Sequence, residues 1–169
     1  MSYHDPVLLQ ECISGLKIDP NGIYVDLTFG GGGHSREILK QLKGGHLFAF
    51  DQDKDAQMNL IEDSRLTFIP HNFRYVRNFL KYFGALPVNG ILADLGISSF
   101  QIDEPTRGFS TRADGPLDMR MSEGIELTAA KVINEYSKEE LARIFRENAD
   151  LKEAWKLSKA IEAARSGTP

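Results

Sequence analysis

Four consecutive glycines, Gly30 to Gly33, constrain the fold of this chain more than any other feature of the sequence. A short apolar run ending at Asp26 precedes them, and a helical pattern with Ile38, Leu39 and Leu42 on one side follows. This pattern predicts a strand, a tight loop and a helix start, where glycines let a ligand approach the backbone and free N–H groups favour polar or anionic groups. We predict a loop for a nucleotide-like cofactor; the plainer alternative is a tight connection without a ligand.

The rest of the first half alternates between short apolar runs and helical patterns. Strands are predicted at residues 23–27, 46–50, 66–70 and 90–94, and helices at 35–42, 54–61 and 72–83. A short amphipathic helix is predicted before them, with Asp5 as N-cap and Pro6 in the first turn. Strands and helices that alternate at this spacing predict an α/β fold with a parallel sheet covered on both faces.

After residue 95 the character of the sequence changes. Residues 96–117 are rich in Gly, Ser, Thr, Asp and Pro, and a stretch this long predicts a functional loop. Only helices are predicted beyond it, at residues 128–135, 138–148 and 151–165, and Ser137 with Glu140 forms a capping box for the second.

Composition limits the classes of function. The formal net charge is −4 and the pI about 5.6, so any contact with RNA has to be local. The single cysteine, Cys12, excludes an internal disulfide framework and a multi-cysteine metal site. We see neither a membrane-spanning run nor a signal peptide, and expect a cytoplasmic protein that binds no membrane.

Acidic residues follow three of the predicted strands: Asp26, Asp51 and Asp94. In an open parallel sheet the carboxyl ends of the strands meet at one edge, where ligands bind, so the three carboxylates should gather there. Asp51 stands about 20 positions after Gly30, near the spacing at which an acid reaches ribose hydroxyls in dinucleotide folds. Capping of the next helix is the alternative role for Asp51.

Two further side chains near this edge are candidate ligand contacts. Phe73 follows the third strand and could stack on a purine ring, although packing on its helix explains it almost as well. His34 lies at a helix N-terminus, where its ring or backbone could contact a ligand; a lone histidine is a poor metal signal, and we predict no metal.

The glycine pattern alone leaves the cofactor open. It lacks the third glycine of the dinucleotide fingerprint, because Ser35 stands in that place. Asp26 argues against an NAD-dependent oxidoreductase, whose loop turns directly from an apolar strand, and favours a ligand with an amino-acid ammonium group that Asp26 could hold.

Several blocks of the sequence together resemble one enzyme family. They are His4-x-Pro6-Val7-Leu8-Leu9-x-Glu11, Asp26-Leu27-Thr28-Phe29-Gly30-Gly31-Gly32-Gly33-His34-Ser35, Asp94-Leu95-Gly96-Ile97-Ser98-Ser99-x-Gln101, Arg107-Gly108-Phe109-Ser110 and Asp114-Gly115-Pro116-Leu117-Asp118-Met119-Arg120-Met121. The chain resembles, from about residue 4 to 165, the bacterial enzymes that methylate the 4-amino group of a cytosine in the decoding region of 16S ribosomal RNA.

The resemblance implies a Rossmann-like class I methyltransferase sheet. Residues 1–104 would be the N-terminal half of the domain that binds S-adenosylmethionine, and residues 105–169 the substrate loop and the start of a helical insertion. The family holds its cofactor at positions that match Gly32, Gly33, His34, Asp51, Phe73, Asp94 and Gln101.

The resemblance also suggests how the substrate is held. Asp94, beside the Leu95 carbonyl, resembles the pair with which amino-methyltransferases accept the hydrogens of the reacting amine; capping of a loop is its simpler role. Candidate contacts to RNA phosphates and bases lie in the long loop, unless it is an ordinary solvated loop: Arg107, Phe109, Arg112, Asp118 and Arg120.

Members of that family are longer than this chain, which stops at Pro169. One alternative function is therefore a fragment that binds the cofactor without turnover. The fourth strand would then be an edge with unpaired backbone groups, so we expect the chain to self-associate as a homodimer or to be marginally stable.

The resemblance also implies a partner: the expected partner in the cell is the small ribosomal subunit.

Overall fold

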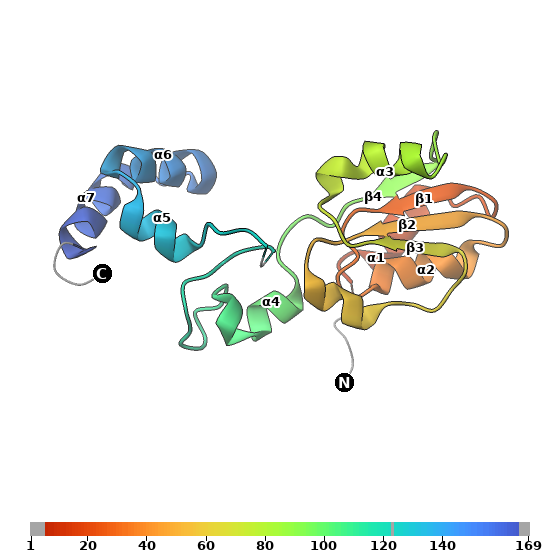
Figure 1. Cartoon of the computed structure of the whole chain (residues 1–169), viewed down its shortest axis with the longest axis horizontal. Coiled ribbons are helices and arrows are strands. Elements are labelled where there is room, and N and C mark those ends of the chain that lie inside the picture. Colours follow the sequence, from red (N-terminus) through yellow and green to blue (C-terminus); the bar gives the residue numbers. More distant parts are fainter. Residues whose placement is uncertain (1–5, 123, 166–169) are drawn as a thin grey trace. The chain divides into compact units, whose positions relative to one another are not determined.

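Four parallel strands form one sheet in the computed structural model of the chain, which describes residues 6–122 and 124–165. They are β1 (Ile23–Asp26), β2 (His46–Phe50), β3 (Leu66–Ile69) and β4 (Gly90–Leu92), in the order β3-β2-β1-β4 (Figure 1). This is the order of the first four strands of a Rossmann-type sheet, so the predicted fold class is confirmed. From β1 the chain adds β2 and β3 on one side and then β4 on the other, so the direction in which strands are added reverses between β1 and β4.

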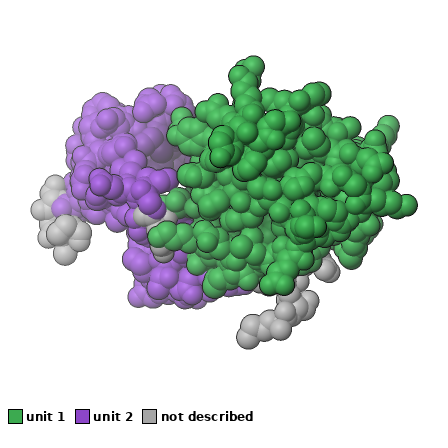
Figure 2. All heavy atoms as spheres, turned by 45° about the vertical axis from the view of Figure 1, so that its right-hand side comes forward, with its two compact units in different colours: residues 1–99, 121–123 green, residues 100–120, 124–169 purple. Residues whose placement is uncertain are grey.

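The chain divides into two compact units, coloured separately in Figure 2. Unit 1 comprises residues 1–99 and 121–123 and contains the sheet, and unit 2 comprises residues 100–120 and 124–169. The assignment of residues 105–169 to a substrate loop and a helical insertion domain stays a prediction.

Helices cover both faces of the sheet in unit 1 (Figure 1). Helices α1 (Leu9–Leu16) and α2 (Gly33–Gln41) pack on the face that carries Tyr24 and Leu47. Helix α3 (Val76–Tyr82) packs on the other face, on Val25, Phe48 and Phe50. Successive side chains of a strand point to opposite faces, so an unbroken apolar run such as β2 supplies both layers of the core.

The first helix begins later than the sequence predicted. Helix α1 starts at Leu9, and its N-cap residue Leu8 has a φ of 49° and makes no side-chain cap bond. Asp5, the predicted N-cap, lies outside the described residues. The prediction of Pro6 in the first helical turn is wrong: Pro6 and Val7 precede the helix and lie against Gly33 and His34 at the start of α2.

Two predicted α-helices are wholly or partly 3-10 helices. Within the predicted helix 54–61, only Lys54–Asn59 are helical, as the 3-10 helix η1, in which only Ala56 is buried. The predicted helix 72–83 starts as the 3-10 turn η2 (Phe73–Tyr75) and continues as α3. Without an apolar stripe to bury, η1 gains little from a longer regular helix.

The long predicted loop contains short helices, α4 (Ser99–Asp103) and the 3-10 turn η3 (Pro105–Arg107). The three helices predicted after it are confirmed as α5 (Ala129–Glu135), α6 (Lys138–Ala149) and α7 (Ala154–Arg165). The capping box is confirmed too: Ser137 N donates to Glu140 Oε2 (2.9 Å), and Glu140 N donates to Ser137 Oγ (3.2 Å). None of the helices in the described part of the chain is long and apolar enough to cross a membrane.

Candidate functional site

The glycine loop follows β1 at the carboxyl edge of the sheet, and its glycines serve different purposes. Gly30 and Gly32 have φ values of 50° and 73°, which favour glycine over other residues. A Cβ on Gly32 would meet the ring of Phe29 at 2.9 Å, and one on Gly33 would lie 2.2 Å from Cγ of Pro6. At Gly30 the nearest atom to such a Cβ is 3.9 Å away, so there is room for a ligand on the side of the backbone where a Cβ would project. The N–H of Gly30 itself donates to Asp51, and its carbonyl oxygen accepts from Asn59 Nδ2 (3.2 Å).

Asp26 ends β1 beneath this loop and is completely buried. Its Oδ2 accepts a hydrogen bond from Ser35 Oγ (2.7 Å), and its Oδ1 accepts one from Thr28 N (3.0 Å). Burial raises the pKa of Asp26 above its ordinary value of 3.8. Both oxygens are thus engaged by the chain itself, and direct contact with a ligand ammonium, which the sequence suggested, stays a prediction that this burial does not favour.

Asp51 follows β2 and is partly exposed beside the loop. Gly30 N donates to its Oδ2 (2.8 Å), and Asp53 N donates to its Oδ1 (2.9 Å). Burial raises the pKa of Asp51, while these backbone donors oppose the rise. The N-cap of η1 is Asp53, which accepts from Asp55 N, so the alternative role of Asp51 as helix cap is not the observed one. Two N–H groups therefore fix a partly exposed carboxylate next to the open side of Gly30.

Asp94 lies just past β4 and is exposed. Its backbone N donates to Thr28 Oγ1 (2.8 Å), which links the segments that follow β1 and β4 across the point where the strand order reverses. Ligands of open α/β sheets bind outside the carboxyl ends at such a point. The three strand-end acids therefore do share one edge, with Asp94 exposed and Asp26 enclosed.

The other predicted cofactor residues lie in different settings. Phe73 is 38% exposed just after β3, with its ring available for stacking. His34 is buried, and its Nε2 lies 3.2 Å from the carbonyl oxygen of Val7, so the ring holds the N-terminal segment over α2. Gln101 belongs to unit 2 and is buried. Its part in the cofactor site stays a prediction.

Most of the predicted RNA contacts instead hold the long loop together. Arg107 is buried, and its Nη2 donates to the carbonyl oxygen of Arg120 (3.0 Å). Arg120 pairs with Asp118 through Nε (2.8 Å) and Nη2 (2.7 Å), which lowers the pKa of Asp118 below its ordinary value. Phe109 is half-buried, and Arg112 is exposed. This is not an ordinary solvated loop, and of the three arginines predicted to contact RNA only Arg112 is exposed. The RNA contacts of the loop stay predictions.

Sequence reasoning missed the polar side chains that join these pieces. Thr28 accepts from Asp94 N, Ser35 donates to Asp26, and Asn72 Nδ2 donates to Gln52 Oε1 (2.7 Å) between the ends of β2 and β3. Thr28 and Ser35 lie in the family block from Asp26 to Ser35, and this was the signal that could have identified them. Nothing in the spacing of Gln52 and Asn72 showed that they would meet.

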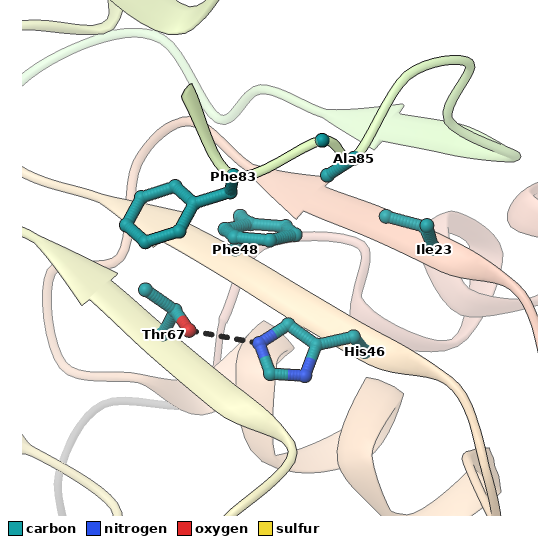
Figure 3. A pocket seen from close by; sticks show the side chains of 7 residues that line it. Ile23, His46, Phe48, Thr67, Phe83 and Ala85 are labelled. Atoms are coloured by element: carbon teal, nitrogen blue, oxygen red, sulfur yellow. Dashed lines mark hydrogen bonds between the residues drawn. The ribbon is translucent and has the colours of Figure 1, made fainter. Parts of the chain in front are cut away.

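The described residues at this edge form no metal site. Among the described residues no group of three or more His, Cys, Asp or Glu side chains could hold a metal ion. A hollow of about 360 Å³ lies instead at the amino ends of β1 and β2, where His46 Nε2 and Thr67 Oγ1 are 2.8 Å apart (Figure 3). It is mainly lined by apolar groups such as Phe48 and Phe83, and lacks the acids of the carboxyl edge.

Comparison with known proteins identifies the family of the chain. The model of the MraW methylase family matches residues 1–169, the whole chain. The chain belongs to the MraW methylase family. The resemblance drawn from the sequence motifs is thereby confirmed.

Individual members of the MraW methylase family match over a part of their length. The chain is 56% identical to the ribosomal RNA small subunit methyltransferase H of Christiangramia forsetii and 54% identical to that of Flavobacterium johnsoniae. Each match covers 100% of this chain but only 56% of the relative. One solved structure, a methyltransferase of an antibiotic biosynthesis pathway from Anabaena variabilis, matches 41% of this chain and 28% of its own chain. Its sequence identity is 16% and its TM-score is 0.35, so this likeness supports no conclusion.

We expect Asp26→Asn to change how stability depends on pH. A raised pKa means that the folded chain binds this proton more readily than the unfolded chain. Proton binding to Asp26 therefore contributes fully to stability below pH 3.8. This contribution is lost as the pH rises through the pKa of the folded state. Urea unfolding across pH should show the free energy of unfolding of the parent, relative to the variant, falling toward neutral pH. Asp103→Asn, at an exposed carboxylate, is the control. A constant or rising difference would contradict the assignment.

Gly33→Ala should displace the segment that lies over α2, because the added methyl would stand 2.2 Å from Pro6. Hydrogen exchange of the amides from Val7 to Cys12 should become faster in this variant than in the parent. Gly15→Ala is the matched control, since no atom lies within 4 Å of its added methyl, and exchange there should not accelerate. Unchanged exchange in Gly33→Ala would show that Pro6 does not rest on this glycine.

Proposed function

We propose that this chain carries the cofactor-binding half of an S-adenosylmethionine-dependent enzyme, which methylates the exocyclic 4-amino group of a cytosine in the decoding region of 16S ribosomal RNA. Membership of the MraW methylase family supports methyl transfer, and the names of its relatives support ribosomal RNA as the substrate. The observation that carries the proposal is the placement of Asp51 and Asp94 at one sheet edge, on either side of the open space at Gly30.

The residues at this edge fit S-adenosylmethionine. The Asp51 carboxylate, fixed by Gly30 N and Asp53 N, is suited to accept hydrogen bonds from ribose hydroxyls. Phe73 offers an exposed ring for the adenine, and the chain at Gly30 leaves room for close approach. When bound, this cofactor supplies a methyl group activated by a sulfonium.

Asp94 is our candidate for the group that receives the amine. The lone pair of an exocyclic cytosine amine is delocalised into the ring, so the amine is a weak nucleophile and has to be positioned accurately. An exposed carboxylate beside the reversal of strand order would accept hydrogen bonds from that amine and would take up the proton that the amine loses on methylation. The base has to leave its stack to reach Asp94, which single-stranded RNA allows at small cost.

Two alternatives differ from this proposal in what the chain would bind or do. Because the chain spans 56% of the relatives named above, it could bind the cofactor without turning it over. An NAD-dependent oxidoreductase, the other alternative, has no support from the family match. Titration with S-adenosylmethionine, its demethylated product and NAD separates the cofactors, and a methylation assay on the small ribosomal subunit separates binding from turnover.

The proposed partners follow from the substrate. We place the protein in the cytoplasm, where it meets the small ribosomal subunit. Strand β4 is the last in the order of the sheet, and Ile91 on it is 51% exposed, so its free edge is suited to pair with a further strand. A second copy of the chain, giving a homodimer, is one source of that strand.

We expect Asp51→Ala to weaken binding of S-adenosylmethionine by about 1–3 kcal/mol, because the ribose hydroxyls lose a charged acceptor and stay unpaired. Calorimetric titration measures this loss directly. Glu62→Ala, at an exposed carboxylate of the same unit, should bind as the parent does. Equal affinities of parent and Asp51→Ala would remove Asp51 from the site.

Asp94→Ala should reduce methyl transfer by at least about tenfold more than it reduces cofactor affinity, because its proposed partner is the reacting amine and the interaction is strongest in the transition state. The rate is measured in a full-length family member with this substitution, and the affinity in the same protein. A loss of rate and affinity in equal proportion would make Asp94 a binding group only.

A further inference from the structure

The distribution of charge in unit 1 is uneven. No Asp or Glu occurs from Ser64 to Ala93, a stretch that contains Arg65, Arg74, Arg77 and Lys81, although the whole chain has a net charge of −4. Arg65 pairs with Asp63 just before this stretch (2.5 Å). The remaining three cations all belong to η2 and α3, so the positive charge is concentrated on one short helical segment.

These three cations share one side of that segment. Positions 74, 77 and 81 are three and four residues apart, which places Arg74, Arg77 and Lys81 together on a helical face with Asn78. All four residues are exposed. Within residues 6–122 and 124–165 none of the three cations forms an ion pair with a carboxylate. By contrast, Lys40, Arg143 and Lys156 each pair with a glutamate three or four residues away in the sequence.

Two tyrosines flank the cations. Tyr82 is 83% exposed and Tyr75 is 46% exposed, and the guanidinium of Arg74 lies 5.5 Å from the centre of the Tyr75 ring. The opposite side of α3 is occupied, since Leu80 is buried and Val76 and Phe79 pack against the core. Figure 1 shows α3 lying over the sheet. We call the exposed residues Arg74, Tyr75, Arg77, Asn78, Lys81 and Tyr82 the α3 cationic face.

We propose that the α3 cationic face binds the backbone and bases of single-stranded RNA. Unpaired cations match the phosphates, and exposed aromatic rings give unstacked bases a surface to stack on. A membrane surface suits this face less well, because a helix that binds membranes inserts its apolar side, and that side of α3 is packed on the sheet. The face begins directly after Phe73, so it continues from the rim of the candidate site.

The test measures binding of a short labelled single-stranded RNA to the chain by fluorescence anisotropy over a series of salt concentrations. Removing three phosphate contacts should reduce the slope of log affinity against log salt by about 2, at about 0.7 per contact. The variant R74Q/R77Q/K81Q should show this smaller slope and bind roughly tenfold more weakly at low salt. Tyr82→Ala should bind about fivefold more weakly or worse, because one base loses its stacking surface.

The matched control is K40Q/R143Q/K156Q, which removes the same charge at exposed cations that already pair with glutamates. It should keep the slope of the parent. Equal slopes for parent and R74Q/R77Q/K81Q, no binding of RNA by the parent, or binding of anionic vesicles as strong as that of RNA would each overturn the inference. If the triple variant does not fold, as its unfolding midpoint shows, Arg77→Glu replaces it.

This inference rests on the proposed function for the choice of RNA, and the two can fail separately. S-adenosylmethionine should bind R74Q/R77Q/K81Q and the parent equally, because the α3 cationic face contains none of the proposed cofactor contacts. A parent that binds the cofactor but no RNA contradicts the inference alone. A parent that binds RNA through this face but not the cofactor contradicts the proposed function alone.

Discussion

The buried carboxylate of Asp26 is the contact on which the candidate site depends. It accepts from the hydroxyl of Ser35 in α2 and from the backbone of Thr28 in the loop, so it joins a strand, a loop and a helix at one point. An enclosed carboxylate with neither partner would be very costly, and its satisfied oxygens therefore hold the loop in one conformation. The positive φ of Gly30 and the open space beside it follow from that conformation.

From this point the arrangement extends along the carboxyl edge through single hydrogen bonds. Thr28 fixes the backbone at Asp94, Gly30 fixes the carboxylate of Asp51, and Asn72 joins the ends of β2 and β3 through Gln52. The scaffold is thus built from backbone groups and small polar side chains. The groups suited to a ligand, Asp51, Phe73 and Asp94, keep exposed surface because other residues do the structural work.

Charge has two separate uses in this acidic chain. In the long loop the arginines are structural: Arg107 donates to the carbonyl oxygen of Arg120, and Arg120 pairs with Asp118. The loop is also tightly packed, because a Cβ on Gly108 or Gly115 would collide with backbone oxygens of the loop. On α3, cations have no such partners in the described part of the chain and face solvent. Local pairing, which net charge does not report, decides which arginines remain available to a polyanion.

Much of the fold was determined by the sequence itself. Short apolar runs that alternate with helical patterns predicted the four strands, and the Ser137–Glu140 capping box predicted the start of α6. The strand-end acids were correctly placed on one edge of the sheet. These features could be predicted because they depend on neighbours in the chain. Only the tertiary structure showed that Gly33 makes room for Pro6, that Asp26 is enclosed, and that Arg107 is buried. Each of these depends on which distant segments come to lie against a residue, and residue type and spacing carry no record of that.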